Sequence, residues 1–176
     1  MKIYRLLTAL FVLPALCGCT GVPEGLQPVT GFDPERYLGT WFEIARLDHS
    51  FERGLSNVSA TYSRGAGEEI AVRNRGYEDK TGKWKEIEGR ARFIENPNVG
   101  SLKVSFFGPF YSGYHIIFLE KENYAYAMVA GYKRDYLWIL SRQPVLDKAI
   151  LADLVSKADQ CGFETDQLIY VTHSAP

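Results

Sequence analysis

From Arg36 to its end, the chain is a succession of short runs rich in β-branched and aromatic residues, which turn-forming residues interrupt about every ten positions. This spacing is typical of an antiparallel sandwich or barrel. It predicts strands at residues 39–47, 56–63, 69–77, 83–94, 101–107, 113–120, 124–131, 136–142 and 168–172. The turn sequences Asp79-Lys80-Thr81-Gly82 and Glu122-Asn123 predict hairpins, so neighbouring strands should be antiparallel.

The run from Trp84 to Ile94 alternates most clearly between apolar and charged residues. One face carries Ile87, Gly89, Ala91 and Phe93, and the other carries Glu86, Glu88, Arg90 and Arg92. One face of the sheet should therefore be in water. Small residues at apolar-face positions, such as Ala60, Gly89 and Ala91, favour a sheet that closes on itself around a cavity. The alternative is that a second sheet or the helix fills this volume.

One segment has helical instead of two-residue periodicity. Between Asp147 and Gln160, the apolar stripe consists of Ile150, Leu151, Leu154, Val155 and Ala158. Asp147 can cap the first turn, and Gly162 can end the helix in a left-handed conformation. We expect this helix to cover the outer face of the sheet.

The first 18 residues have the pattern of a signal peptide. Lys2 and Arg5 precede an apolar run from Leu6 to Leu16, which is too short to span a bilayer core of about 30 Å. The sequence Leu16-Cys17-Gly18-Cys19 resembles the bacterial lipobox, and Cys19 fits as the acylated residue, whereas Cys17 would follow a bulky leucine. The resemblance implies a diacylglyceryl thioether and an amide-linked acyl chain such as palmitate on Cys19.

The alternative for this segment is an ordinary secretory cleavage nearby. Thr20, in place of an aspartate, resembles the pattern of lipoproteins sent to the outer membrane. The prediction is a removed signal peptide at residues 1–18, an acylated N-terminus and tether at 19–31 that holds the protein off the membrane, and one domain at 32–176.

Charge and local motifs exclude several classes of function. Lys and Arg number 20 against 21 Asp and Glu, so a formal net charge of −1 argues against a nucleic-acid partner. The three histidines, His49, His115 and His173, lie far apart with no cluster at ligand spacing, so neither a metal nor a cofactor is expected. There is no nucleophile elbow, P-loop or dinucleotide fingerprint. Cys161 ends the predicted helix, where a thiol behaves as a small apolar group, so no catalytic residue is predicted.

Three short motifs resemble those of the lipocalin family. Gly39-Thr40-Trp41 resembles the first motif, Arg134-Asp135-Tyr136 the second, and Leu140-Ser141-Arg142 the third, whose arginine stacks on the motif-one tryptophan. The resemblance covers about residues 32 to 172. Longer matches to the bacterial outer-membrane subgroup are Trp41-Phe42-Glu43-Ile44-Ala45-Arg46, Phe51-Glu52-Arg53-Gly54, the stretch Val104 to Tyr111, and the stretch Asp135 to Arg142.

The resemblance implies an all-β fold, namely an eight-stranded antiparallel up-and-down barrel with one C-terminal helix packed outside and a short final strand. It implies that Gly39, Trp41 and Arg142 close the base, and that the interior binds lysophospholipids or fatty acids for storage or transport without catalysis. By the two-residue alternation of a strand, counted from Arg142, the side chains of Tyr136, Trp138, Leu140 and Arg142 should point to the same side of the sheet. On another strand, Tyr114, Ile116 and Phe118 are the corresponding candidates for inward-facing side chains.

For ligand contact we expect Tyr114 and Trp138, together with Phe106 and Tyr136; the alternative is that they form filled core. The resemblance further implies a lipid-anchored protein that faces the periplasm from the outer membrane, with a possible homodimer. A lipid-modifying enzyme and an envelope interaction module are the alternative functions.

Overall fold

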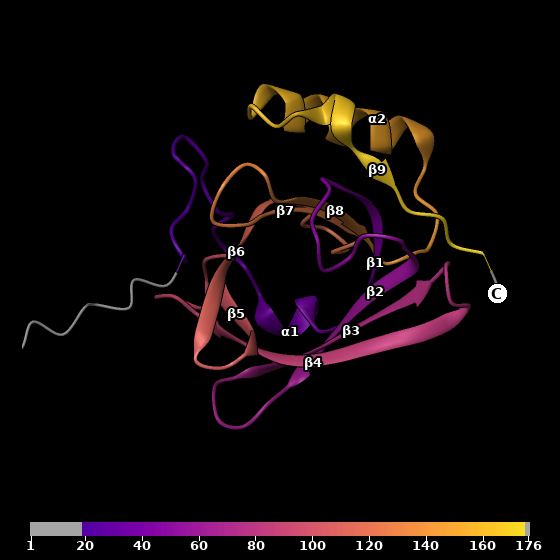
Figure 1. The fold of residues 1–176 in the computed structure, drawn as a ribbon. Helices are drawn as coiled ribbons and strands as arrows, with labels where there is room; N and C mark the ends of the chain where they lie inside the picture. The colour runs from indigo at the N-terminus through magenta and orange to yellow at the C-terminus, as the bar shows by residue number, and fades with distance from the viewer. Residues whose placement is uncertain (1–18, 175–176) are drawn as a thin grey trace, which may run out of the picture.

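The computed structural model describes residues 19–174, so the predicted signal peptide lies outside the described residues. The strands are β1(Gly39–Arg46), β2(Leu55–Arg64), β3(Ile70–Glu78), β4(Lys83–Phe93), β5(Ser101–Phe107), β6(Phe110–Leu119), β7(Tyr126–Ala130), β8(Leu137–Ser141) and β9(Ile169–Tyr170). Consecutive strands from β1 to β8 pair antiparallel, and β8 returns to β1, which closes the barrel. Figure 1 shows these strands as a ring. The predicted fold class is confirmed.

Each predicted strand overlaps an observed one, and the predicted helix is α2(Lys148–Gln160). The Asp147 side chain caps it by accepting hydrogen bonds from the amides of Ala149 and Ile150, and Gly162 follows with a φ of 78°. Two short elements were not predicted from the sequence, namely α1(Pro34–Tyr37) and η1(Thr165–Gln167). Asp33 caps α1 and Pro34 begins it, so the signal for α1 was present in the sequence.

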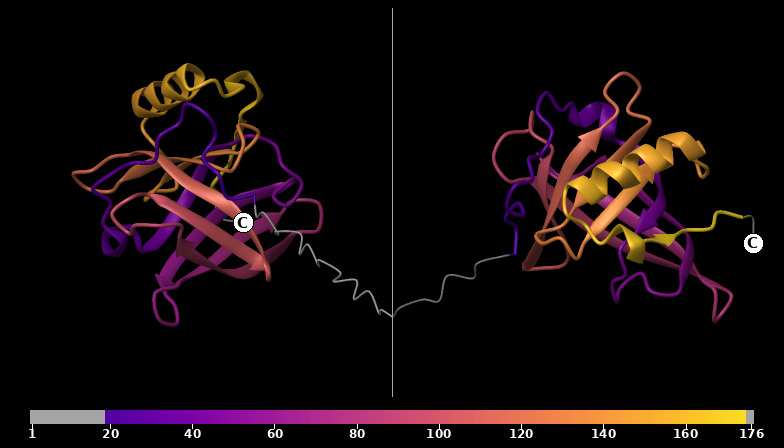
Figure 2. Two further views of the ribbon diagram at one scale, coloured as in Figure 1. Left: turned by 90° about the vertical axis from the view of Figure 1, so that its left-hand side faces the viewer. Right: turned by 90° about the horizontal axis from the view of Figure 1, so that it is seen from above.

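Two apolar cores lie on opposite faces of the barrel wall. The inner core contains Phe32, Tyr37, Trp41, Tyr62, Ile70, Val72, Ala91, Leu102, Ile116, Leu119, Tyr124, Ala127, Val129 and Leu140. The outer core lies between α2 and the wall, and includes Ile44, Met128, Ile139, Leu154 and Ala158. Figure 2 shows α2 lying across one side of the barrel. The helix therefore leaves the barrel interior free of its side chains.

β1 has different partners along its length. Its first half pairs with β2, and its last residues pair with β9. Both partners lie along the edge of β1 that does not face β8. Where β1 and β2 separate, the C-terminal segment fills the gap: the Asn57 amide donates to Thr172 O at 2.9 Å, and His173 Nε2 lies 2.7 Å from Glu43 O. The segment after α2 therefore seals the seam of the barrel.

The predicted inward position of Phe118 is wrong. A register shift between Ile116 and Phe118 on β6 breaks the two-residue alternation. Phe118 consequently stacks on Tyr126 at 6.2 Å and packs in the outer core. A β-bulge adds one residue to a strand, and every later side chain then changes face.

The segment 19–31 lies against the barrel instead of forming a detached tether. Cys19 forms a parallel bridge with Ser112, and the Gly113 amide donates to Cys19 O at 2.8 Å. Further along, the Val29 amide donates to Ile116 O at 2.8 Å, and Leu26 is buried. No helix within residues 19–174 is both long and apolar enough to cross a membrane.

Candidate functional site in the barrel interior

The closed end of the barrel is built around Trp41, which is fully buried. The Arg142 guanidinium carbon lies 4.0 Å from the centroid of the Trp41 ring. The same guanidinium donates to three carbonyl oxygens, of Thr40, Arg36 and Tyr124, at 3.0, 2.7 and 3.3 Å. Gly39 has a φ of 97°, and a Cβ there would lie 3.2 Å from Arg142 Nη1. The structure thus places the three motif residues in one contact at the base.

A cluster of three tyrosines lies next to this base. Tyr37 comes from α1 and stacks on Trp41 at 4.6 Å. Its hydroxyl and that of Tyr62 each lie 2.8 Å from the Tyr114 hydroxyl. Burial raises the pKa of all three phenols, so they remain neutral hydrogen-bonding groups. Tyr114 was predicted to face inward, whereas the roles of Tyr37 and Tyr62 were not foreseen.

Several inward-facing side chains keep part of their surface accessible. They are Ala60, Val104, Phe106, Tyr114 and Trp138, all of which pack against the inner core without being fully buried. The interior is therefore not completely filled beside them. Gly89 contributes no space of this kind, because a Cβ there would lie 2.6 Å from Phe106 Cδ1. The expectation that Gly89 marks a void is corrected: the Phe106 ring occupies it.

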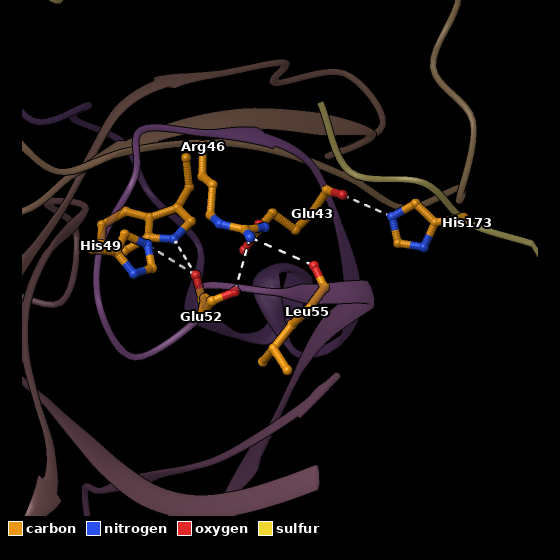
Figure 3. A network of polar contacts seen from close by, with 7 residues as sticks. Glu43, Arg46, His49, Glu52, Leu55 and His173 are labelled. Carbon is orange, nitrogen blue, oxygen red and sulfur yellow. Dashed lines mark hydrogen bonds and ion pairs between the residues drawn. The ribbon is translucent and has the colours of Figure 1, made fainter. Parts of the chain in front are cut away.

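Nearer the opposite end, the interior becomes charged (Figure 3). Arg46 Nη1 donates to Glu43 Oε1 at 2.6 Å and Arg46 Nη2 to Glu52 O at 2.8 Å. Trp138 Nε1 donates to Glu52 Oε2 at 3.1 Å, and His49 Nε2 lies 2.9 Å from the same oxygen, although it is not aligned for a full hydrogen bond. All four of these charged or titratable residues are at most 7% exposed.

The two carboxyl groups of this network differ in protonation. Burial, followed by the nearby Glu52 carboxylate, raises the pKa of Glu43 well above its usual range, and Arg46 only partly offsets this. Burial also opposes ionisation of Glu52, but the close contact with His49 and its charge, and the hydrogen bond from Trp138, lower the pKa of Glu52. Glu43 therefore holds a proton more readily than Glu52.

The sequence analysis missed this network. Glu43 lies two residues after Trp41, so simple alternation could have placed it inside. Arg46 also points inward, because a register shift between Glu43 and Ala45 changes its face. His49 and Glu52 belong to a loop, residues 47–54, whose inward fold has no periodic signal.

The remaining predicted residue, Tyr136, lies on the rim at this end. Its ring stacks on Trp138 at 6.1 Å, and rings of His49 and Phe51 lie 6.0 and 6.5 Å away. Two surface hollows, of about 330 and 540 Å³, lie outside the barrel and touch none of these residues. Within the described residues, no group of three or more His, Cys, Asp or Glu side chains could hold a metal ion.

Comparison with known proteins identifies the fold family. A family model described as a lipocalin-like domain matches residues 32–173. The chain belongs to the lipocalin family. This lipocalin is 51% identical to the outer membrane lipoprotein Blc of Vibrio cholerae over 89% of the chain and 91% of that protein. It is 47% identical to the protein of the same name from Escherichia coli K12, over 93% of this chain and 92% of the relative.

Solved structures agree on the lipocalin fold. Insecticyanin from the tobacco hornworm superposes with a TM-score of 0.70 at 22% identity, and covers 88% of this chain and 87% of its own. The cockroach allergen Per a 4 superposes with a TM-score of 0.68 at 21% identity, over 88% and 96% of the two chains. Membership of this family, together with the interior described above, indicates a binding protein for small hydrophobic ligands.

Proposed function

We propose that this lipocalin is anchored in the outer membrane through acylated Cys19, faces the periplasm, and binds lysophospholipids or fatty acids in its barrel for storage or transport, without catalysis. The observation that carries the proposal is the division of the interior into an apolar, aromatic depth and a charged region nearer the opening. A single-chain amphiphile has the same two parts.

The apolar depth suits an acyl chain. Burial of each CH₂ contributes about 0.8 kcal/mol, so a long chain gains roughly 10 kcal/mol before ordering and association are subtracted. A shallow surface patch recovers too little of this energy to hold a lipid. Phe106, Tyr114 and Trp138 pack against the inner core and are only partly buried, so they would be the apolar surfaces that an acyl chain contacts.

The charged region suits a polar headgroup. Arg46 Nε and His49 Nδ1 are buried and have no hydrogen-bond partner within residues 19–174. Buried polar atoms without partners are costly, and a ligand's phosphate or carboxylate oxygens would satisfy them. The Glu52 carboxylate beside them can in turn accept from an ammonium or hydroxyl group of the ligand.

The anchor is supported by the lipobox at Cys19 and by the relatives named outer membrane lipoprotein. Mass spectrometry of the protein from its own cells would show an N-terminal Cys19 carrying a diacylglyceryl group and an acyl chain. Cys19→Ser should release the protein from the membrane. Retention of this variant to the same extent as the unmodified chain would overturn the anchor.

Ligand binding is tested by calorimetric titration of delipidated protein with lysophospholipids and fatty acids of several chain lengths. We expect saturable binding at one site, and at least tenfold weaker binding in Trp138→Leu, since each tenfold corresponds to about 1.4 kcal/mol. Tyr170→Leu is the matched control, because Tyr170 is an exposed aromatic residue on β9, outside the barrel. Absence of binding at every chain length would overturn the proposal.

The same preparation tests the alternatives. Native mass spectrometry should recover added lipid unchanged in mass, whereas a modified lipid would indicate an enzyme. A thiol mechanism is disfavoured by the position of Cys161, which ends α2 outside the barrel, where its carbonyl accepts from Arg134 Nε at 2.8 Å. Light scattering with and without lipid tests the proposed homodimer.

A further inference from the structure

We propose that the open end of the barrel is apposed to the bilayer that holds the anchor, with Phe107 and Phe110 inserted into that leaflet. The open end is where the loops 47–54, 79–82, 108–109 and 131–136 lie, opposite Trp41 and α1. The inference rests on the proposed acylation of Cys19 and adds an orientation and a docking surface to it.

Cys19 lies at the open end of the barrel. It pairs with Ser112 near the start of β6, and the Gly113 amide donates to its carbonyl at 2.8 Å. Ser112 follows Phe110 by two residues on one strand, a separation of about 7 Å along the chain. Acyl chains on Cys19 would therefore leave the protein beside the β5–β6 hairpin, on the rim of the open end.

The segment after Cys19 is held against the barrel. His115 Nε2 lies 3.0 Å from Gly21 O, and Arg134 Nη2 donates to Glu24 O at 2.6 Å. Leu26 is buried, and Val29 is hydrogen-bonded to β6. Figures 1 and 2 show this indigo segment lying along the barrel wall. Because the segment is docked, the anchor cannot swing freely, and the membrane surface must lie close to the rim.

An exposed aromatic pair lies at the tip of the β5–β6 hairpin. Phe107 and Phe110 face each other across the hairpin and are 73% and 69% exposed. On another loop of the same end, Phe51 is 60% exposed. Exposed clusters of large apolar side chains mark interaction surfaces, and phenylalanine at the edge of a leaflet recovers its burial energy.

Basic and amphipathic side chains surround this pair. Arg90 and Lys103 lie 6.0 and 5.4 Å from the Tyr111 ring, and neither forms an ion pair within residues 19–174. A Cβ on Gly108, in the hairpin tip, would lie 3.2 Å from Arg90 Nη2. Long cationic side chains beside tyrosine and phenylalanine are suited to the headgroup layer, where they can reach lipid phosphates. In this orientation a lipid passes between leaflet and barrel without crossing water.

The experiment uses the acylated full chain in vesicles of phosphatidylethanolamine and phosphatidylglycerol. In a Cys161→Ser background, a nitroxide is attached at Phe110→Cys or, as the control, at Val145→Cys. Val145 is 75% exposed and lies between β8 and α2, at the closed end. We expect the ratio of collisions with oxygen to collisions with a water-soluble nickel chelate to be several-fold higher at position 110. Equal, water-like ratios at both positions would overturn the proposal.

A second measurement avoids the label. The unacylated Cys19→Ser chain should still associate weakly with the same vesicles, and Phe107→Ser and Phe110→Ser should each reduce its partitioning about tenfold. Val145→Ser should leave partitioning unchanged. Equal partitioning of all variants would contradict leaflet insertion.

The outcomes separate this inference from the proposed function. An unmodified Cys19 in the mass spectrum overturns the anchor. If Cys19 is acylated but the nitroxides at positions 110 and 145 both give water-like collision ratios, only the orientation is overturned. Spin–spin broadening at position 110 together with a dimer in light scattering would show that a second copy of the chain, and not the leaflet, covers the rim. That result would also overturn the proposed orientation. The titration of delipidated protein with lipid tests ligand binding and does not depend on any of these three outcomes.

Discussion

Glu43 is a carboxylic acid in the wall of an otherwise apolar barrel, 2.6 Å from the buried Arg46 guanidinium. Such groups are costly to bury and are seldom kept for stability alone. Its position beside Glu52 means that the interior carries a proton whose occupancy changes with pH. At the residue scale, this interior proton and the Arg142 contact at the base should each make a measurable contribution to stability.

The Glu43 carboxyl should make stability depend on pH with a definite sign. Its pKa is raised by burial and by Glu52, so the folded chain holds a proton that the unfolded chain has lost. The free energy of unfolding contributed by this group should therefore fall as pH rises above about 4.5, by up to about 1.4 kcal/mol per pH unit. In urea unfolding at pH 5 and pH 8, Glu43→Gln should lose less stability on going to pH 8 than the unmodified chain.

Glu52→Gln is the matched comparison for this measurement. The pKa of Glu52 is lowered, so its contribution has the opposite sign and is lost as pH falls. If the free energy of unfolding changed equally between pH 5 and pH 8 in the unmodified chain and in Glu43→Gln, Glu43 would be charged in the folded protein.

Arg142 joins the base of the barrel through one ring contact and three carbonyl oxygens. Arg142→Ala should lower the free energy of unfolding by about 3 kcal/mol, because these acceptors lose their donor and the Trp41 ring is uncovered. Arg142→Lys should recover little, since one ammonium cannot reach all three carbonyls. Urea unfolding measures the loss in both Arg142 variants. Arg73→Ala is the control, because the Arg73 side chain is exposed. A loss below 1 kcal/mol would contradict this role.

At the scale of elements, the strands were predictable because their periodicity is strong and continues along the chain. The two-residue pattern placed Ile87, Ala91 and Phe93 on one face without knowledge of any partner strand. What it could not reveal were the register shifts, which depend on pairing with neighbouring strands. These shifts turned Phe118 outward and Arg46 inward, and they account for one wrong prediction and for part of the missed network.

The seal formed by the C-terminal segment was equally hidden from sequence reasoning, because it joins residues more than a hundred positions apart. His173 bonds Glu43 O and meets the Phe42 ring edge-on at 5.6 Å. His173→Ala should lower the free energy of unfolding by about 1–2 kcal/mol. Thr172→Ala should not, because only the Thr172 backbone carbonyl takes part, with the Asn57 amide. Equal unfolding midpoints in urea for the two variants would show that the seam does not need this contact.

The helix α2 should stabilise the fold without taking part in ligand binding. Leu154 is fully buried in the outer core, so Leu154→Ala should cost about 3 kcal/mol in urea unfolding, compared with almost nothing for the exposed Ser156→Ala. The same variant, titrated with lipid under folding conditions, should keep its affinity. A large change in affinity would show that the outer core is coupled to the barrel interior.

At the scale of the whole molecule, binding and stability should be linked. A ligand held only by the folded barrel raises the free energy of unfolding by about 2.7 kcal/mol at one hundred times its Kd. Thermal unfolding with increasing lysophospholipid should therefore shift upward, and Trp138→Leu should need proportionally more ligand for the same shift. A ligand that binds the chain but leaves its unfolding unchanged would be bound elsewhere or equally by the unfolded state.

The closure of the sheet has a consequence for crowding. Since β1 meets β8 on one side and both β2 and β9 on the other, the strands close into a ring. Within the described residues, the unpaired strand edges include the two-residue β9 and the part of β4 before Arg90, which pairs with β3 but not with β5. The unpaired backbone groups of an edge strand are the usual template on which a second chain adds a strand to the sheet. On the free part of β4 this template is blunted by charged side chains, namely Lys83, Lys85, Glu86 and Glu88. Copies held at a membrane by the proposed anchor should therefore remain dispersed where an open, apolar sheet edge would polymerise.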